Sequence, residues 1–209
     1  MNLGLQTAHR LVRGLMRRAA AVLNRLSRGK LRPDMVTLAG FAVHLPIAFL
    51  IATSHNILAA ILLIIFGLFD TLDGELARLQ NKASPRGMLL DAATDRMKEV
   101  LLYTGAAYAL ALGRHPATAA WAAAAVGASL CVSYVKAKGE AAVVSSGRKI
   151  SHAKLNHLFG GGILSFEIRM VILIIGLFAG ELVYAVAIIA VLASLTAVQR
   201  LIKTLKQID

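Results

Sequence analysis

Four of the chain's six aspartates lie in one short stretch, between hydrophobic runs that a lipid bilayer would accept. Asp70 and Asp73 are three residues apart. Asp91 and Asp95 are four residues apart, and at either spacing the two carboxylates share one face of a helix. The interval 79–86 is polar and contains a proline, which predicts a turn between two antiparallel helices. The two aspartate pairs would then face each other.

Such a cluster of carboxylates predicts a metal site. Four carboxylates in one place repel one another and cannot all stay ionised in apolar surroundings unless cations compensate them. The stretch offers oxygen ligands, without a nearby cysteine or histidine. This donor set favours a hard cation, Mg²⁺ or Mn²⁺, over zinc. The predicted metal ligands are Asp70, Asp73, Asp91 and Asp95.

Smaller residues in the same stretch suit a ligand that carries phosphate. Gly74, Ala77 and Arg78 share the face of the first aspartate pair. Gly87 lies one turn before Asp91, and both glycines remove side chains where phosphates or a neighbouring helix must come close. The planar donor fork of Arg78 suits phosphate. A plain membrane hairpin would need one capping acid per helix end, so it does not account for four acids facing inward.

Composition places the chain among membrane proteins. Of its 209 residues, 57% are hydrophobic and the mean hydropathy is +0.68, whereas soluble domains are about 45–50% apolar. The formal net charge of +12 would also suit nucleic acid. The basic residues, however, lie at the ends of hydrophobic runs, as membrane topology would place them. We therefore expect membrane lipids as partners and no nucleic acid.

The pattern along the chain predicts an all-α, polytopic membrane protein with six transmembrane helices in one domain, residues 33–209. Residues 1–32 alternate leucine and arginine at helical spacing, which is typical of an amphipathic juxtamembrane helix on an anionic membrane face. Their basic residues continue throughout, so a cleavable signal sequence is not expected. Asp34 is expected to cap the first span. The predicted spans are 35–53, 57–79, 87–112, 117–135, 160–179 and 181–201.

Charge predicts the orientation of these spans. An even number of spans places both termini on one side of the membrane, and 21 of the 23 Lys and Arg residues fall on that side. The excess of basic residues on cytoplasmic segments then makes both termini and the aspartate cluster cytoplasmic, at the cell inner membrane.

The pattern D-x2-D-G-x2-A-R-x8-G-x3-D-x3-D, from Asp70 to Asp95, resembles the signature of the CDP-alcohol phosphotransferase family at all eight specified positions. The resemblance implies an integral membrane enzyme of the EC 2.7.8 type. Such an enzyme transfers a phosphatidyl-type group from CDP-diacylglycerol or a CDP-linked ether lipid to an alcohol and releases CMP. It implies two Mg²⁺ or Mn²⁺ ions per active site, Asp95 as the catalytic base, and a homodimer.

The same resemblance implies which residues bind the nucleotide. Residues 33–37 resemble the P-N/D-x-x-T element that lies near the nucleotide in this family. Together with the motif, the implied CDP-binding residues are Asp34, Thr37, Asp73, Gly74, Ala77, Arg78 and Gly87.

Cations near the cytoplasmic ends of spans four to six resemble the acceptor site of the bacterial phosphatidylinositol-phosphate synthases of this family. The matching segments are 133–138 and 198–201, and Arg169 matches the last arginine of an R-P-E-R-like element. Lys138 stands where those enzymes have arginine, and the earlier basic residue of the R-P-E-R-like element is absent. The resemblance implies a phosphorylated polar alcohol as acceptor, inositol 1-phosphate first. The implied phosphate-binding residues are Lys136, Lys138, Arg169 and Arg200.

Other interpretations stay open at this point. The acceptor of a phosphatidylglycerophosphate synthase, glycerol 3-phosphate, would suit the same cations, and the cations also serve membrane topology alone. A divalent-cation transporter would use the same carboxylates but needs acids along a path to the far side. In this sequence, Glu181 is the acid expected toward that side.

Overall fold

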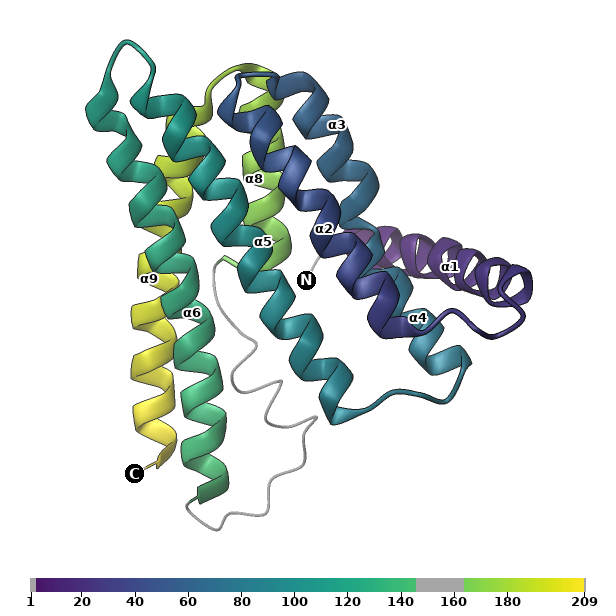
Figure 1. The fold of residues 1–209 in the computed structure, drawn as a ribbon. Helices are drawn as coiled ribbons and strands as arrows, with labels where there is room; N and C mark the ends of the chain where they lie inside the picture. Colours follow the sequence, from purple (N-terminus) through teal and green to yellow (C-terminus); the bar gives the residue numbers. More distant parts are fainter. Residues whose placement is uncertain (1–2, 146–163, 209) are drawn as a thin grey trace. The chain divides into compact units, whose positions relative to one another are not determined.

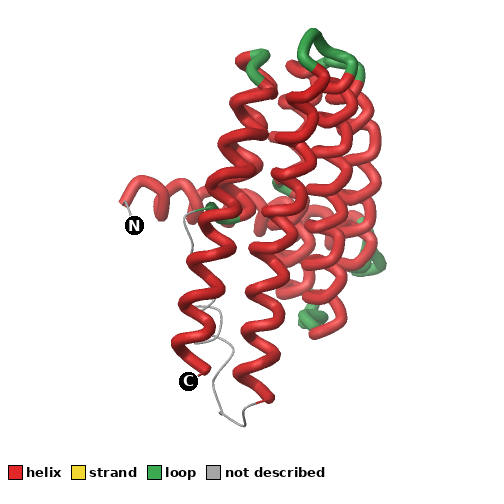
Figure 2. Tube along the Cα trace, turned by 90° about the vertical axis from the view of Figure 1, so that its left-hand side faces the viewer, coloured by secondary structure: helices red, strands yellow, loops and turns green. Residues whose placement is uncertain are grey.

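The computed structural model describes residues 3–145 and 164–208, and every regular element in these two ranges is a helix (Figures 1 and 2). This confirms the all-α prediction for the described part of the chain. The helices are α1 Leu3–Leu26, α2 Pro33–Ala52, α3 Asn56–Gly67, α4 Phe69–Leu79, α5 Pro85–Ala111, the short 3-10 helix η1 Pro116–Thr118, α6 Ala119–Ser145, α8 Phe166–Ala179 and α9 Leu182–Ile208.

Several of these helices could cross a bilayer. Four stretches of the described residues are long and apolar enough, and they correspond to the first, second, fourth and sixth predicted spans. Helix α5 carries charged residues through its first half, and α8 has 14 residues in the described part. The number of six spans therefore stays a prediction. The four stretches are Pro33–Ala52, Asn56–Leu79, Pro116–Ser145 and Leu182–Lys206.

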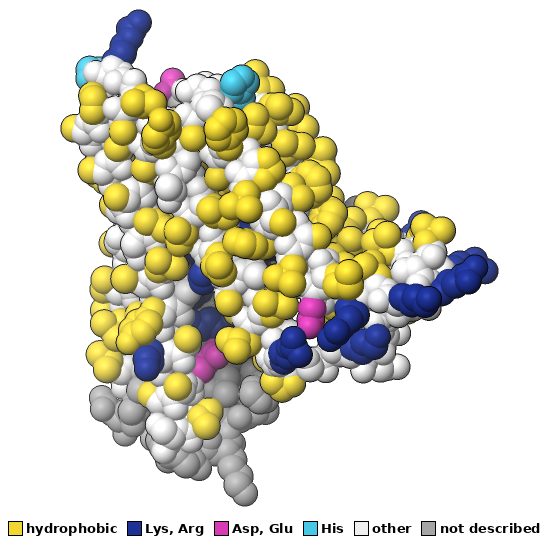
Figure 3. Space-filling model, in the orientation of Figure 1, with side chains coloured by type: hydrophobic (Ala, Val, Ile, Leu, Met, Phe, Trp, Pro, Cys, Tyr) yellow, Lys and Arg dark blue, Asp and Glu magenta, His cyan; other side chains and the backbone are white. Residues whose placement is uncertain are grey.

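The chain divides into two compact units. Unit 1 comprises residues 1–47 and 61–101, and unit 2 comprises residues 48–60 and 102–209. Within unit 1, α1 packs against α4 through a small core in which Ala20, Leu72 and Leu76 are buried. Lys and Arg side chains gather over α1 and the turn after it (Figure 3). This arrangement fits an amphipathic helix with one apolar and one basic face.

The first helix is shorter than predicted, because a left-handed turn ends it at Leu26. Gly29 has a φ of 74° and donates its N–H to the carbonyl of Asn24 at 2.8 Å, which is a common way to close a helix. Helix α2 then begins at Pro33, where proline suits a first helical position. Asp34 thus lies inside the first turn, not before it as expected of a cap, and there it complements the helix dipole.

Within unit 2, α6 runs along α9 in both views (Figures 1 and 2), and α8 also packs on α9. Small buried residues, Ala125 on α6 and Ala193 on α9, let helices approach closely, as is common in membrane proteins. Helix α6 continues to Ser145, beyond the predicted end of its span at residue 135. The Lys136–Glu140 pair, four residues apart, supports this extension.

The contact between Gly105 of α5 and Ala48 of α2, both in unit 2, predicts a large effect of a small substitution. A Cβ atom at Gly105 would lie 2.4 Å from the carbonyl oxygen of Ala48, so the backbones would have to move apart. Gly105→Ala should lower the free energy of unfolding by roughly 1–3 kcal/mol, as overpacking does. Thermal unfolding in detergent measures this change.

Gly127→Ala on α6 is the matched control. A Cβ atom there would meet nothing within 4 Å, so the gain in helix propensity should leave stability equal or higher. Equal melting temperatures for Gly105→Ala and the unchanged protein would contradict the close approach of α2 and α5.

Candidate active site

Helix α4 carries the first half of the aspartate motif. Asp70, Asp73 and the residues up to Arg78 lie on it, after a break in the helix at Leu68. The side chain of Asp70 lies outside the part that the structure describes. Asp73 is 5% exposed, and its Oδ2 accepts a hydrogen bond of 2.5 Å from the hydroxyl of Thr37 on α2. Thr37 and Asp73 are both predicted nucleotide-binding residues, and the structure brings them together although they are 36 positions apart in the sequence.

Helix α5 carries the second half of the motif in its first three turns. The hydroxyl of Ser84 accepts a hydrogen bond of 3.2 Å from the N–H of Gly87 and so caps the helix start. Asp91 and Asp95 follow one turn apart and are both half-buried. At the helix start, Arg86 lies 3.9 Å from Asp34 of α2. The predicted turn between the two halves is confirmed at residues 80–84.

The donor chemistry of the described aspartates fits a hard divalent cation. Asp73, Asp91 and Asp95 offer carboxylate oxygens, the ligands that Mg²⁺ and Mn²⁺ prefer. Among the described side chains, which leave out Asp70, no three carboxylate, imidazole or thiol groups lie close enough together to hold one ion. The four-aspartate metal site therefore stays a prediction.

Arg78 lies along α4, over the glycine of the motif. A Cβ atom at Gly74 would lie 3.5 Å from Nη2 of Arg78 and 3.8 Å from its Nη1, so the guanidinium lies next to the glycine at ordinary contact distance. The Arg78 side chain is 58% exposed. Ala77 lies between Gly74 and Arg78 in the sequence, and its side chain is half-buried. This end of α4 presents a planar cation that can reach an anionic ligand.

Two buried charges on α5 were missed by the sequence analysis. Lys98 is 1% exposed, and its ammonium lies 3.2 Å from Oδ1 of Asp95. Glu99 is fully buried and pairs with Arg96 at 3.1 Å. Each pair is three residues apart, on one helix face. The sequence could have indicated these residues, because placing a charged side chain inside a hydrophobic run costs free energy, and such residues commonly have a functional or structural role.

Two of the predicted acceptor-site cations are buried in unit 2. Arg169 is 1% exposed and donates from Nη1 to the carbonyl of Leu164 at 3.2 Å. Arg200 is also buried and donates from Nη1 to the carbonyl of Val132 at 3.2 Å. Arg169 lies in the first turn of α8, which begins after the Ser165 cap, and residues 160–163 of the predicted fifth span lie outside the described residues. These contacts fix the direction of both guanidinium groups.

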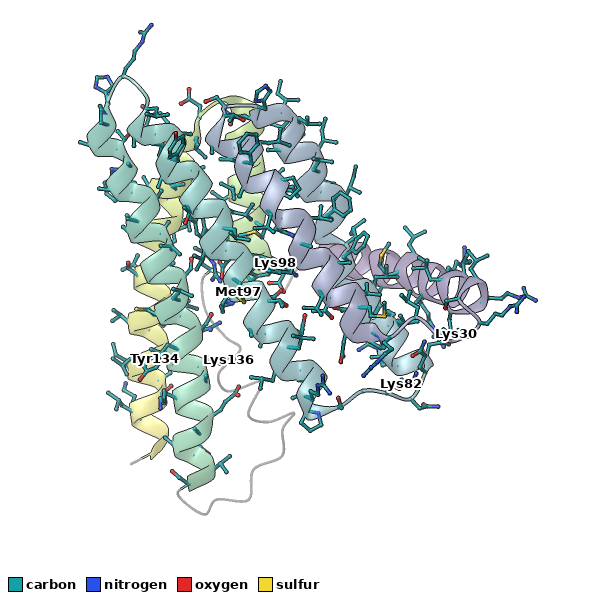
Figure 4. All side chains as sticks on the ribbon, in the orientation of Figure 1. Lys30, Lys82, Met97, Lys98, Tyr134 and Lys136 are labelled. Carbon is teal, nitrogen blue, oxygen red and sulfur yellow. The ribbon has the colours of Figure 1, made fainter. Side chains whose placement is uncertain are left out.

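The two lysines of α6 have different surroundings. Lys136 is half-buried and lies 3.8 Å from Glu140. Lys138 is exposed, and its ammonium lies 5.9 Å from the ring centre of Tyr134. Tyr134 and Lys136 project from opposite sides of α6 (Figure 4). Lys138 therefore shares the side of Tyr134, while Lys136 faces the other way.

Comparison with known proteins identifies relatives along most of the chain. Residues 30–198 match the family described as CDP-alcohol phosphatidyltransferase. A bifunctional IPC transferase and DIPP synthase of Rubrobacter xylanophilus is 35% identical over 172 residues, which are 82% of this chain and 37% of that protein. A phosphatidylinositol phosphate synthase of Corynebacterium glutamicum is 32% identical over 151 residues, 71% of this chain and 63% of that protein. The chain thus matches less than two thirds of the length of these two relatives.

Solved structures share the fold. A phosphatidylinositol phosphate synthase of Mycobacterium tuberculosis with CDP-DAG bound has a TM-score of 0.76 at 26% identity, covering 90% of this chain and 92% of that one. The same enzyme in complex with manganese and citrate has a TM-score of 0.77 at 26% identity, covering 91% and 88%.

Proposed function

Because the chain belongs to the CDP-alcohol phosphatidyltransferase family, we propose that it transfers the phosphatidyl group of a CDP-linked lipid to inositol 1-phosphate and releases CMP. The donor is CDP-diacylglycerol or its ether-linked counterpart. The observation that carries the proposal is the family match over residues 30–198, which contains the complete aspartate motif. The choice of acceptor is supported by relatives that are named phosphatidylinositol phosphate synthases.

The aspartates would hold the metal, as the manganese-bound relative supports. In this proposal Asp70, Asp73, Asp91 and Asp95 hold two Mg²⁺ or Mn²⁺ ions. Bound ions neutralise the charge that builds on the phosphate oxygens when CMP departs. Thr37 orients the Asp73 carboxylate through its 2.5 Å hydrogen bond.

Asp95 takes the proton of the acceptor hydroxyl. The hydroxyl oxygen forms a bond to the lipid-linked phosphorus, and the bond from that phosphorus to the CMP oxygen breaks. Lys98 holds one carboxylate oxygen of Asp95 at 3.2 Å and so limits the rotation of the base. A charge-assisted contact of this kind is stronger than a neutral one.

The CDP moiety would be bound by the motif residues and the start of α2, and the acceptor phosphate by cations of α6, α8 and α9. Arg78 supplies a donor fork, and Gly74 and Gly87 leave space for the phosphates. The remaining proposed nucleotide contacts are Asp34, Thr37, Asp73 and Ala77. For the acceptor phosphate, the proposed ligands are Arg169 and Arg200, whose guanidinium groups are held by backbone carbonyls, and Lys136. Lys138 belongs to the same predicted set, but its position over Tyr134 gives it the weakest structural support.

The chain is an integral membrane protein by its apolar helices and its family. We further propose that both termini and the active site face the cytoplasm of the cell inner membrane, which the distribution of 21 of 23 basic residues supports. We also propose a homodimer, as the family resemblance implies.

The direct test is CMP release by the purified full-length protein from CDP-diacylglycerol, with one acceptor at a time. Inositol 1-phosphate should support turnover at least about tenfold better than glycerol 3-phosphate or inositol. Inositol lacks the phosphate, and glycerol 3-phosphate would place it differently, so each would lose charged hydrogen bonds to the protein. Chelation of divalent metal should stop the reaction. Preference for glycerol 3-phosphate would make the protein a phosphatidylglycerophosphate synthase, and no CMP release with any acceptor would overturn the proposal.

A further inference from the structure

Glu75 is a buried acid in one of the unspecified positions of the aspartate motif. It lies on α4 directly after Gly74, and its side chain is 8% exposed. Removing a carboxylate from water is unfavourable unless charged partners compensate it. Two arginines do so here, Arg78 one turn later on α4 and Arg13 on α1.

The contact with Arg78 is short. Nη2 of Arg78 donates to Oε1 of Glu75 at 2.6 Å, a length typical of strong charge-assisted hydrogen bonds. The guanidinium also lies against Gly74, whose added Cβ would stand 3.5 Å from Nη2. One edge of the fork is therefore held by Glu75, while 58% of the side chain stays exposed to a ligand.

The contact with Arg13 connects α1 to the motif. Nε of Arg13 lies 3.8 Å from Oε1 of Glu75, and the Arg13 side chain is 63% exposed. Further along the two helices, Nε2 of Gln80 donates to Oδ1 of Asn24 at 2.8 Å. Ala20 of α1 and Leu76 of α4 are fully buried in the core of unit 1 and lie between these two polar contacts in sequence, so the part of α1 from Arg13 to Asn24 packs on α4. Docking of α1 is what brings Arg13 to Glu75.

We infer that Glu75 is a positioning residue of the donor site: together with Arg13 of α1, it holds the Arg78 guanidinium over Gly74, in the orientation that receives the CDP moiety of the lipid. The inference rests on the proposed function, in which Arg78 binds the donor. Preorganisation is the physical reason, since an arginine that is already ordered loses less side-chain entropy when it binds phosphate. The basic surface helix thus belongs to the donor site.

The test compares KM values of the full-length protein for CDP-diacylglycerol and for inositol 1-phosphate. Arg78→Ala should raise the donor KM about tenfold or more. Glu75→Gln should raise the donor KM roughly three- to tenfold, with kcat and the acceptor KM unchanged. Glu75→Gln combined with Arg78→Ala should match Arg78→Ala alone, because Glu75 acts through Arg78. A purely structural role of Glu75 would change both KM values and kcat together.

Arg13→Ala should raise the donor KM about twofold, the smaller effect expected of an exposed pair. Arg17→Ala is the matched control, since it removes an exposed arginine of the same helix and should leave both KM values unchanged. If Glu75→Gln lowers the melting temperature by several degrees, the comparison of Arg13→Ala with Arg17→Ala decides the inference on its own.

The outcomes separate this inference from the proposed function. An unchanged donor KM in Arg78→Ala would refute the role of Arg78 in the proposed function. A raised donor KM in Arg78→Ala with an unchanged one in Glu75→Gln would overturn the inference alone. The inference would also be overturned if the double variant raised the donor KM by the product of the factors that Glu75→Gln and Arg78→Ala cause separately.

Discussion

Replacing Asp91 by Asn should abolish CMP release, by on the order of a thousandfold or more, while the protein stays folded. The amide keeps the size of the side chain but removes the negative charge that a hard cation requires. A thousandfold loss corresponds to about 4 kcal/mol of transition-state stabilisation, a reasonable share for metal ions that neutralise a departing phosphate. The same result is expected for Asp70→Asn, Asp73→Asn and Asp95→Asn.

The measurement needs a second readout that does not depend on turnover. Addition of Mn²⁺ should raise the melting temperature of the unchanged protein by mass action, and this rise should be lost in Asp91→Asn. Glu181→Gln is the matched control, since it removes an exposed acid outside the motif and should keep both activity and the Mn²⁺ response. Near-normal CMP release by Asp91→Asn would show that the two-metal assignment is wrong.

Arg200→Ala should raise the KM for inositol 1-phosphate by one to two decades and leave the KM for the lipid donor unchanged. Arg200 is buried, and its Nη1 is anchored to the carbonyl of Val132, so the direction of its donor fork is fixed before any ligand binds. A lost charged hydrogen bond of roughly 1.5–3 kcal/mol corresponds to this change in KM. A fixed positive charge would also attract the anionic acceptor from the cytosol.

Two lysine variants make this prediction specific. Lys203→Ala removes an exposed cation from the same helix and should have little effect on the acceptor KM. Lys138→Ala should raise the acceptor KM less than Arg200→Ala does, because the Lys138 side chain is exposed and its ammonium lies 5.9 Å from the ring centre of Tyr134. Use of inositol as readily as inositol 1-phosphate would refute a phosphate-binding role of Arg200.

The chemistry of the motif could be predicted because it depends on residue types at fixed spacing. Asp91 and Asp95 share a helix face at four residues apart wherever the helix lies. The helices themselves follow from hydrophobic runs and helix-breaking turns, and the turn at residues 80–84 is found inside the predicted interval. The predicted helix ends were less accurate. Helix α1 ends at Leu26, before the left-handed turn at Gly29, and α6 continues past its lysines to Ser145.

The sequence by itself thus determined the all-α class, the membrane setting and the family to which the motif belongs, because local spacing and hydropathy suffice for these. Tertiary packing alone decided the environment of each charge. It buries Lys98 beside Asp95, joins Thr37 to Asp73, and docks α1 so that Arg13 reaches Glu75. The physical reason is that the energy of a charged side chain depends on its solvent exposure and its partners. For Thr37 and Arg13, those partners come from helices that are far apart in the sequence.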